Sequence, residues 1–361
     1  MLKSFLCDLV IVVLAFALSW FFIYDISSLS YFSPLEKSSD FETSDFYQLV
    51  SDSRAVRTLN DDIVVVSVDD LSRGEITDAL EMISLCEPAA VGIDVLFGFP
   101  QEDDPRLVEV LSGMSNVVVP DTSAYIYSSC PGLIQGSVYL EADSYRSTVR
   151  ECITDGAFTS RLAYLYRAGI ELPERMRIEY PGVEFNVIHA AELPDVPELL
   201  EGKIVLVGVV NDFSDVHPTP VDDAMPGILI HASAIATMLS PDRVTDFPEW
   251  ADWLVAIVLC YAFVSSTRIL KRYDWGDLVM RVVQIAVLIL IIIIGTEMYV
   301  SHHIDVNFSR PLVMIAAGTL AVDVWNGMDG LAGIFMRRIR IRRIGRFRKL
   351  ILEKRNKPSA V

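Results

Sequence analysis

Four apolar runs constrain this 361-residue chain more than any other feature. The first covers Phe5–Tyr24, and a helix needs about 20 such residues to cross the hydrocarbon core of a membrane. The other three are Trp253–Val264 (extending to Ile269), Leu278–Val300 and Pro311–Trp325. The pattern predicts four transmembrane helices, one N-terminal and three C-terminal. A cleaved signal peptide has a shorter apolar core, so we expect the first run to be an uncleaved anchor.

The distribution of charge predicts how these helices are oriented. The net charge of −18 combines +10 in residues 337–361, where eleven bases face one acid, with −28 in residues 1–336. More basic residues flank the connection between the second and third runs: Arg268, Lys271, Arg272 and Arg281. The positive-inside rule puts both basic segments in the cytoplasm. Both termini are then cytoplasmic and residues 25–249 are extracytoplasmic, followed by three spans in residues 250–326 and a basic tail in residues 327–361.

The basic tail is open to two interpretations. It alternates arginine with isoleucine, phenylalanine and leucine, with imperfect amphipathicity. It is either a juxtamembrane helix on anionic lipid or a docking helix for a cytoplasmic partner. RNA is the weakest alternative, and the acidic remainder of the chain argues against a nucleic-acid ligand. The residues expected to make lipid or partner contacts are Arg337, Arg338, Arg340, Arg342, Arg343, Arg346, Arg348 and Lys349.

The extracytoplasmic segment reads as one α/β domain. Short β-branched runs typical of fully buried strands occur at Ile63–Val68, Ala90–Phe97, Val117–Pro120 and Ile204–Val210. Helical spacing separates or follows them at 76–85, 104–111, 159–166 and 228–239. This alternation predicts a mainly parallel, buried sheet flanked by helices, with right-handed crossovers. Residues 121–187 are expected to form mostly loops and edge strands.

Acidic residues follow several of these strands. Ligands of open parallel sheets bind at the carboxyl ends of the strands. Asp69, Asp94, Asp212, Asp215 and His217 are therefore candidates to converge on a cation or another polar ligand. The competing interpretation is that the carboxylates cap helices and satisfy turn backbones.

Two histidines and two cysteines each have two possible roles. His217 and His231 are candidates for a pH sensor, but His231 lies among apolar residues and is expected to be a hydrogen-bonded core histidine. Cys130 and Cys152 form a disulfide in an oxidising compartment or remain two buried thiols, because the sequence does not fix the pairing.

Four segments together resemble a known family. Asp62–Asp70, Ala89–Phe97, Asn116–Pro120 and Gly202–Leu239 are similar in order and spacing to the CHASE2 family of bacterial extracytoplasmic sensory domains. The family layout implies one span, the sensory domain and then three spans, in the bacterial inner membrane. Members typically continue into a histidine kinase, a nucleotide cyclase or a serine/threonine kinase, whereas this sequence stops at Val361. The resemblance carries no binding residues over.

These observations lead to three hypotheses about function. The sequence holds no G-x-S-x-G, P-loop, H-E-x-x-H or C-x-x-C motif, so we expect neither an enzyme nor a metal or other cofactor. The favoured hypothesis is an oligomeric sensor subunit that binds an unidentified extracytoplasmic ligand, contacts membrane lipids and relays to a separate cytoplasmic effector. The alternative is a structural scaffold of a bacterial membrane complex without a ligand. A periplasmic hydrolase using Asp94 and His217 is the third.

Overall fold

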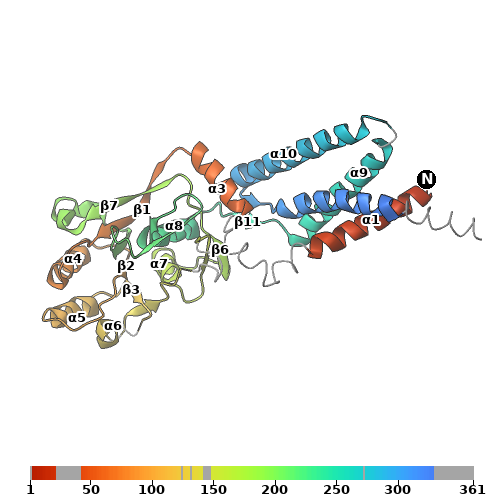
Figure 1. Ribbon diagram of the computed structural model, residues 1–361. Helices are drawn as coiled ribbons and strands as arrows, with labels where there is room; N and C mark the ends of the chain where they lie inside the picture. Colours follow the sequence, from red (N-terminus) through yellow and green to blue (C-terminus); the bar gives the residue numbers. More distant parts are fainter. Residues whose placement is uncertain are drawn as a thin grey trace, which may run out of the picture. The chain divides into compact units, whose positions relative to one another are not determined.

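The computed structural model describes residues 2–21, 42–122, 125–130, 132–140, 148–270 and 273–328 (Figure 1). These residues form two compact units. The α/β unit comprises residues 42–246 together with Gly295–Val306. The helical unit comprises residues 2–21, Phe247–Ile294 and 307–328. Helix α10 (Gly276–His302) belongs to both units, because the division falls between Ile294 and Gly295. The predicted basic residues of the tail lie outside the described residues.

A six-stranded parallel sheet forms the centre of the α/β unit and confirms the predicted parallel sheet. Its strand order is β4-β3-β2-β8-β1-β7. The central strand β8 is buried along its whole length, because neighbouring strands and helices enclose both of its faces. The strands are β1 (Thr58–Ser67), β2 (Ala90–Asp94), β3 (Val117–Pro120), β4 (Ile134–Gly136), β7 (Val183–His189) and β8 (Ile204–Gly208).

Helices cover both faces of this sheet. Helices α4 (Arg73–Leu85), α5 (Asp104–Gly113) and α6 (Tyr125–Ser129) pack on one face with the 3-10 helix η2 (Ala190–Asp195). Helices α7 (Phe158–Tyr166) and α8 (Gly227–Leu239) pack on the other. Side chains alternate along each strand, so β1 sends Val64 and Val66 to the first face and Ile63 and Val65 to the second.

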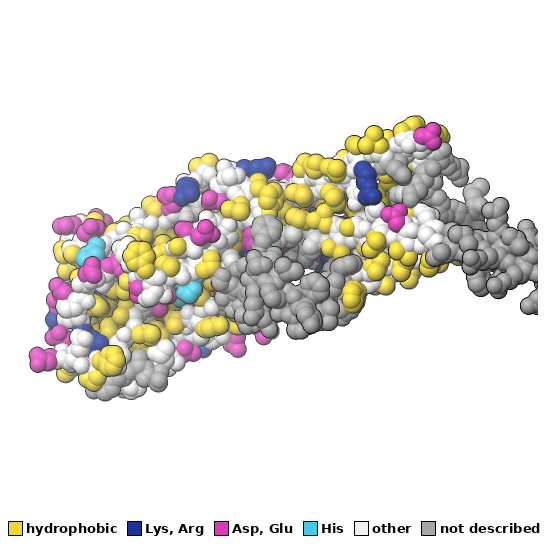
Figure 2. All heavy atoms as spheres, in the orientation of Figure 1, with side chains coloured by type: hydrophobic (Ala, Val, Ile, Leu, Met, Phe, Trp, Pro, Cys, Tyr) yellow, Lys and Arg dark blue, Asp and Glu magenta, His cyan; other side chains and the backbone are white. Residues whose placement is uncertain are grey.

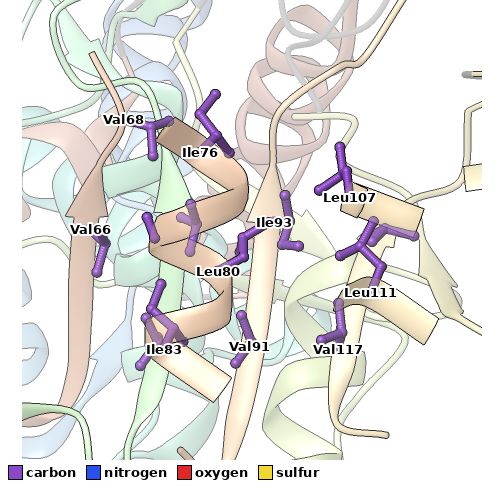
Figure 3. Packing of buried hydrophobic residues seen from close by; sticks show 14 of the residues in the cluster. Val66, Val68, Ile76, Leu80, Ile83, Val91, Ile93, Leu107, Leu111 and Val117 are labelled. Carbon is purple, nitrogen blue, oxygen red and sulfur yellow. The ribbon is translucent and has the colours of Figure 1, made fainter. Parts of the chain in front are cut away.

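Helix α4 illustrates how the sequence builds one of these layers. Its N-terminus is a capping box, in which Ser72 accepts from the backbone of Glu75 and Glu75 accepts from the backbone of Ser72. One stripe of the helix, Ile76, Leu80 and Ile83, then faces the sheet. Figure 3 shows these side chains against Val66, Val91 and Ile93, with Leu107 and Leu111 of α5 beside them. Most of these side chains are fully buried.

The opposite layer depends on glycine. A Cβ at Gly92 would lie 2.6 Å from Leu162 and 2.7 Å from Phe158, so α7 packs against β2 only because this position has no side chain. The two cysteines considered for a disulfide are both free. Cys130 lies in the cluster under α4 and α5, whereas Cys152 packs with the cluster under α7 and α8. Cys130 is buried and Cys152 is partly buried.

Several smaller elements complete the α/β unit, and some correct the predicted boundaries. Strand β2 ends at Asp94 rather than Phe97, and β8 ends at Gly208 rather than Val210. The edge strand β7 was not predicted as a separate strand, because its half-buried residues lack the apolar run of the central strands. The remaining elements are α3 (Thr43–Arg54), β5 (Glu151–Ile153), β6 (Arg175–Arg177), η3 (Pro197–Leu199), β9 (Val216–His217), β10 (Met225–Pro226), β11 (Thr245–Asp246) and β12 (Ile304–Asp305).

The helical unit contains three helices that are long and apolar enough to cross a membrane. The candidate spans are Glu249–Thr267 within α9 (Glu249–Leu270), Leu278–His302 within α10, and Ser309–Met328. Large apolar side chains of α10 such as Leu278 and Ile289 are exposed, as expected of a helix that faces lipid (Figure 2). In α1 (Leu2–Trp20) the apolar part is Leu6–Trp20, only 15 residues, so the predicted N-terminal span is shorter than the other three.

Candidate functional site at the carboxyl edge of the sheet

Three neighbouring strands end at the same level of the sheet. Asp94 at the end of β2 is paired with Gly208 at the end of β8, and Gly208 is paired with Ser67 at the end of β1. The helices that follow β1 and β2 pack on one face, and α8, which follows β8, packs on the other. Ligands of open α/β sheets bind where consecutive connections diverge in this way.

A pair formed by a largely buried acid and a fully buried histidine lies at this divergence. Asp94 points to the same face as α8, and its Oδ2 lies 3.7 Å from Nε2 of His231. The His231 side chain is 5% exposed and packs edge-on against the ring of Phe158. Its Nδ1 has no hydrogen-bond partner among the described residues, so this is not the hydrogen-bonded core histidine expected from the sequence. A buried polar atom without a protein partner costs about 1–3 kcal/mol, so such atoms are uncommon in folded domains.

Asp215 and His217 extend this pair toward the surface. His217 Nε2 lies 3.3 Å from Oδ1 of Asp215, and both side chains are partly exposed. The Asp215 carboxylate lies against Gly227, where a Cβ would be only 2.7 Å from Oδ2, while the Gly227 N–H donates to the Asp215 carbonyl at 3.0 Å. Because Gly227 and His231 are four residues apart in α8, they share one helix face. The missing side chain at Gly227 thus brings Asp215 to the site.

Burial shifts the pKa values of the two members of this pair in opposite directions. Burial raises the pKa of Asp94 to about 7, and the negative charge of Asp215 acts in the same direction. Burial lowers the pKa of His231 to about 4, against the opposing effect of Asp215. Between these values the pair is a neutral carboxylic acid beside a neutral imidazole, since neither charged form is solvated.

The other two predicted acids are held by hydrogen bonds: Asp212 within its own turn, and Asp69 both within its turn and from the loop after β8. Asp69 accepts hydrogen bonds from Ser67 Oγ at 2.6 Å, from the Val210 N–H at 2.9 Å and from Asn211 Nδ2 at 2.7 Å. Burial acts to raise the pKa of Asp69, but these hydrogen bonds together bring it below its usual value. Asp212 accepts from the backbone and hydroxyl of Ser214, which lower its pKa. Both fit the turn-forming alternative, and their part in binding a ligand stays a prediction.

The described residues contain no group of three or more His, Cys, Asp or Glu side chains placed to hold a metal ion. Of the predicted residues, the structure brings together Asp94, Asp215 and His217. It adds His231 and Gly227, which the sequence analysis did not include in the site. The spacing of Gly227 and His231 on one helical turn was the signal that could have placed them there.

A second polar region, which the sequence analysis missed, lies elsewhere in the α/β unit. Arg150 forms a bidentate pair with Asp45 of α3, with both N–O distances 2.7 Å and both side chains buried. Arg177 of β6 lies 3.2 Å from Asp305 of β12. Burial raises the pKa of Asp305, and Arg177 opposes that shift. We call this the arginine cluster; its further acids, 3.6–3.7 Å from Arg177, are Glu42, Glu151 and Asp246.

The arginine cluster holds the end of a candidate membrane span. Asp305 lies three residues after α10, and the hydroxyl of Tyr47 donates to the carbonyl of Val306 at 2.8 Å. The ring of Tyr47 also stacks on Tyr299 in the last turns of α10, with centroids 5.5 Å apart. These pairings join residues more than 100 positions apart, so no local sequence pattern indicates them.

Comparison with known proteins assigns the family. Residues 12–265 match the model of the CHASE2 domain, which is more than half of the chain, and the chain belongs to the CHASE2 family. No curated protein and no solved structure matches it. The protein is therefore a membrane protein with an extracytoplasmic sensory domain and three candidate spans. A sensory domain implies a ligand, and the family assignment identifies a sensory domain rather than a catalytic one.

Proposed function

We propose that this protein is a bacterial inner-membrane sensor that responds to a ligand at the carboxyl edge of its sheet and relays the response to a cytoplasmic effector. The observation that carries the proposal is the buried Asp94–His231 pair, with its unpartnered imidazole nitrogen, at the point where the connections diverge. In this proposal residues 25–249 face outward, α1 is a fourth span despite its short apolar part, and both termini are cytoplasmic.

A chain of contacts supports a relay from the site to α10. The helix that carries His231 also carries Ile230 and Ala234, which pack with Ile178 and Val149. Ile178 adjoins Arg177 and Val149 adjoins Arg150, so α8 touches the segments that position the arginine cluster. Nearby, the Glu179 N–H donates to Thr237 of α8 at 3.0 Å.

The last step of the relay is covalent. Arg177 holds Asp305, and only two residues separate Asp305 from the last residue of α10. A shift of α8 that changes the arginine cluster would thus act directly on a candidate span. Signalling needs only a few kcal/mol of preference between two packings of such an element.

Hydrogen exchange in the full chain, reconstituted in lipid nanodiscs, tests this relay without knowledge of the ligand. The probe is Asp215→Asn, which removes the charge nearest Asp94 and leaves a side chain of similar size. We expect changed protection both in residues 209–231 and in residues 295–306. The matched control is Asp78→Asn, which removes an exposed acid paired with Arg106 on α4 and α5. It should leave residues 295–306 unchanged.

The scaffold alternative gives the opposite result. If Asp215→Asn alters protection only around residues 209–231, the site is not coupled to α10 and the relay is wrong. A scaffold without a ligand would then be the better account of the chain.

A further inference from the structure

The loops at the carboxyl edge carry a one-sided charge. Residues 68–72, 94–103 and 209–223 follow the three aligned strands β1, β2 and β8, and they contain no lysine or arginine. The nearest base in sequence, Arg73, is buried and paired with Asp104. Such a surface concentrates cations. The nine acids of these loops are Asp69, Asp70, Asp94, Glu102, Asp103, Asp212, Asp215, Asp222 and Asp223.

The side chains at this edge suit an organic cation better than a metal ion. Calcium takes six to eight oxygen ligands, whereas the carboxylates of Asp69 and Asp212 already accept hydrogen bonds from residues of the loops. An ammonium group brings up to three N–H donors of its own and needs only a few acceptors. Asp94 and Asp215 supply carboxylate acceptors, and Asp94 is sensitive to the charge of Asp215.

The buried histidine points independently to a ligand. His231 lies behind Asp94 with an unpartnered Nδ1, and the exposure of the side chains rises from 5% at His231 through 16% at Asp94 to 51% at Asp215. These residues form a polar series that leads from the surface inward. A cation beside Asp94 would stabilise its carboxylate form and compensate the cost of its burial.

Exposed apolar side chains in the same loops indicate that the ligand carries a hydrocarbon part beside its cationic group. Phe213 is 95% exposed, Phe99 is 81% exposed and Leu96 is 63% exposed. Phe99 and Leu96 follow β2, and Phe213 follows β8, the neighbouring strand. Exposed aromatic faces attract both cations and hydrocarbon.

From these observations, and resting on the proposed function, we infer that the carboxyl edge binds a small organic amine in its ammonium form. Asp94 and Asp215 accept hydrogen bonds from the ammonium group, and Phe213 contacts the hydrocarbon part. Charge selects cations over neutral molecules, and the aromatic side chains select organic cations over metal ions.

Thermal unfolding and calorimetric titration of the full chain in nanodiscs of zwitterionic lipid test this inference. The probe is benzylamine, compared at equal ionic strength with benzyl alcohol, which has nearly the same shape but no charge, and with MgCl₂ and CaCl₂. We expect benzylamine to bind and raise the unfolding temperature, and the other three to do neither. Asp215→Asn should weaken benzylamine binding about tenfold, as expected for loss of a charged hydrogen-bond partner.

Phe213→Ala serves as the second variant, because a side chain 95% exposed can be removed without unfolding the domain. It should weaken benzylamine binding about threefold, within the range of an exposed cation–π contact, while Asp78→Asn should leave it unchanged. The inference is overturned if benzyl alcohol or the metal ions bind as well as benzylamine, or if Asp215→Asn binds benzylamine as the native chain does. The hydrogen-exchange test of the relay involves no amine, so it can succeed where this one fails.

Discussion

The arginine cluster and the carboxyl edge are two solutions to the same problem of burying acids. In the cluster, Arg150 and Arg177 accompany their carboxylates into the interior, and Arg150 meets Asp45 in a bidentate pair. At the carboxyl edge, Asp94 is largely buried beside a histidine whose pKa is lowered, and near another acid. Burial raises the pKa of Asp94 to about 7, and no lysine or arginine is paired with it among the described residues. The first arrangement fixes elements in place, whereas the second stays responsive to protons and cations.

The largest expected effect comes from breaking the arginine cluster. Asp45→Ala leaves the buried Arg150 guanidinium without its bidentate partner, and loss of one partner of a buried pair typically costs about 3–5 kcal/mol. Chemical denaturation of the α/β unit within the full chain should show this loss. The control, Asp78→Ala, breaks an ion pair whose side chains are 51% and 62% exposed and should cost less than about 1 kcal/mol. Equal losses for the two variants would contradict the structural role assigned to the cluster.

The Asp94–His231 pair predicts a pH dependence of stability that is visible only when one member of the pair is replaced. The pKa of Asp94 is about 7 in the folded state, above its unfolded value, so its contribution to stability is lost as pH rises from about 4 to 7. The pKa of His231 is about 4, below its unfolded value, so its contribution is lost as pH falls from about 6.5 to 4. In the native chain the two effects nearly cancel, because folding moves a proton from the histidine to the acid.

Single substitutions should therefore give opposite slopes. His231→Gln leaves Asp94, and stability should fall by about 4 kcal/mol from pH 4 to 7 relative to the native chain. Asp94→Asn leaves His231, and stability should rise by about 3 kcal/mol from pH 4 to 6.5. Thermal unfolding between about pH 4.5 and 7.5 measures both slopes. Slopes of the same sign in both variants would show that the pair does not exchange a proton on folding.

The two regions also differ in how far the sequence predicts them. The buried runs around Val65, Ile93 and Leu206 indicate central parallel strands, because only a sheet covered on both faces tolerates such runs. Aligned parallel strands then place Asp94 and the loop with Asp215 at one edge. The arginine cluster has no such signal, since the pairing of Arg177 with Asp305 depends on a contact between segments far apart in the chain.

The sequence predicted that the site lies at the carboxyl edge of the sheet, but it did not predict all of the side chains that form the site. His231 was expected to be a satisfied core residue, and its missing partner depends on where α8 sits over β2. Asp69 and Asp212 were grouped with Asp94, yet short polar side chains after strands accept hydrogen bonds from nearby loop residues as readily as from a ligand. The local alternatives have similar energies, so tertiary packing decides among them.

The smallest expected effect on stability comes from Gly227→Ala. This variant separates the effect on ligand affinity from the effect on folding stability. The added methyl group would lie 2.7 Å from the Asp215 carboxylate, the mobile end of a half-exposed side chain, so the acid moves aside at little cost. Alanine also favours the helix, by about 0.5–1 kcal/mol over glycine, so stability should change by less than about 1 kcal/mol.

Because Asp215 is displaced, benzylamine binding should weaken about threefold or more, which corresponds to less than one charged hydrogen bond. Gly113→Ala is the control, since a Cβ there meets no other atom within 4 Å. Calorimetric titration and thermal unfolding of both variants separate affinity from stability. A large loss of stability without loss of affinity would place Gly227 in the packing of α8, and Asp215 outside the ligand site. Loss of affinity alone would place Asp215 in the site, where its carboxylate would bind the cationic ligand.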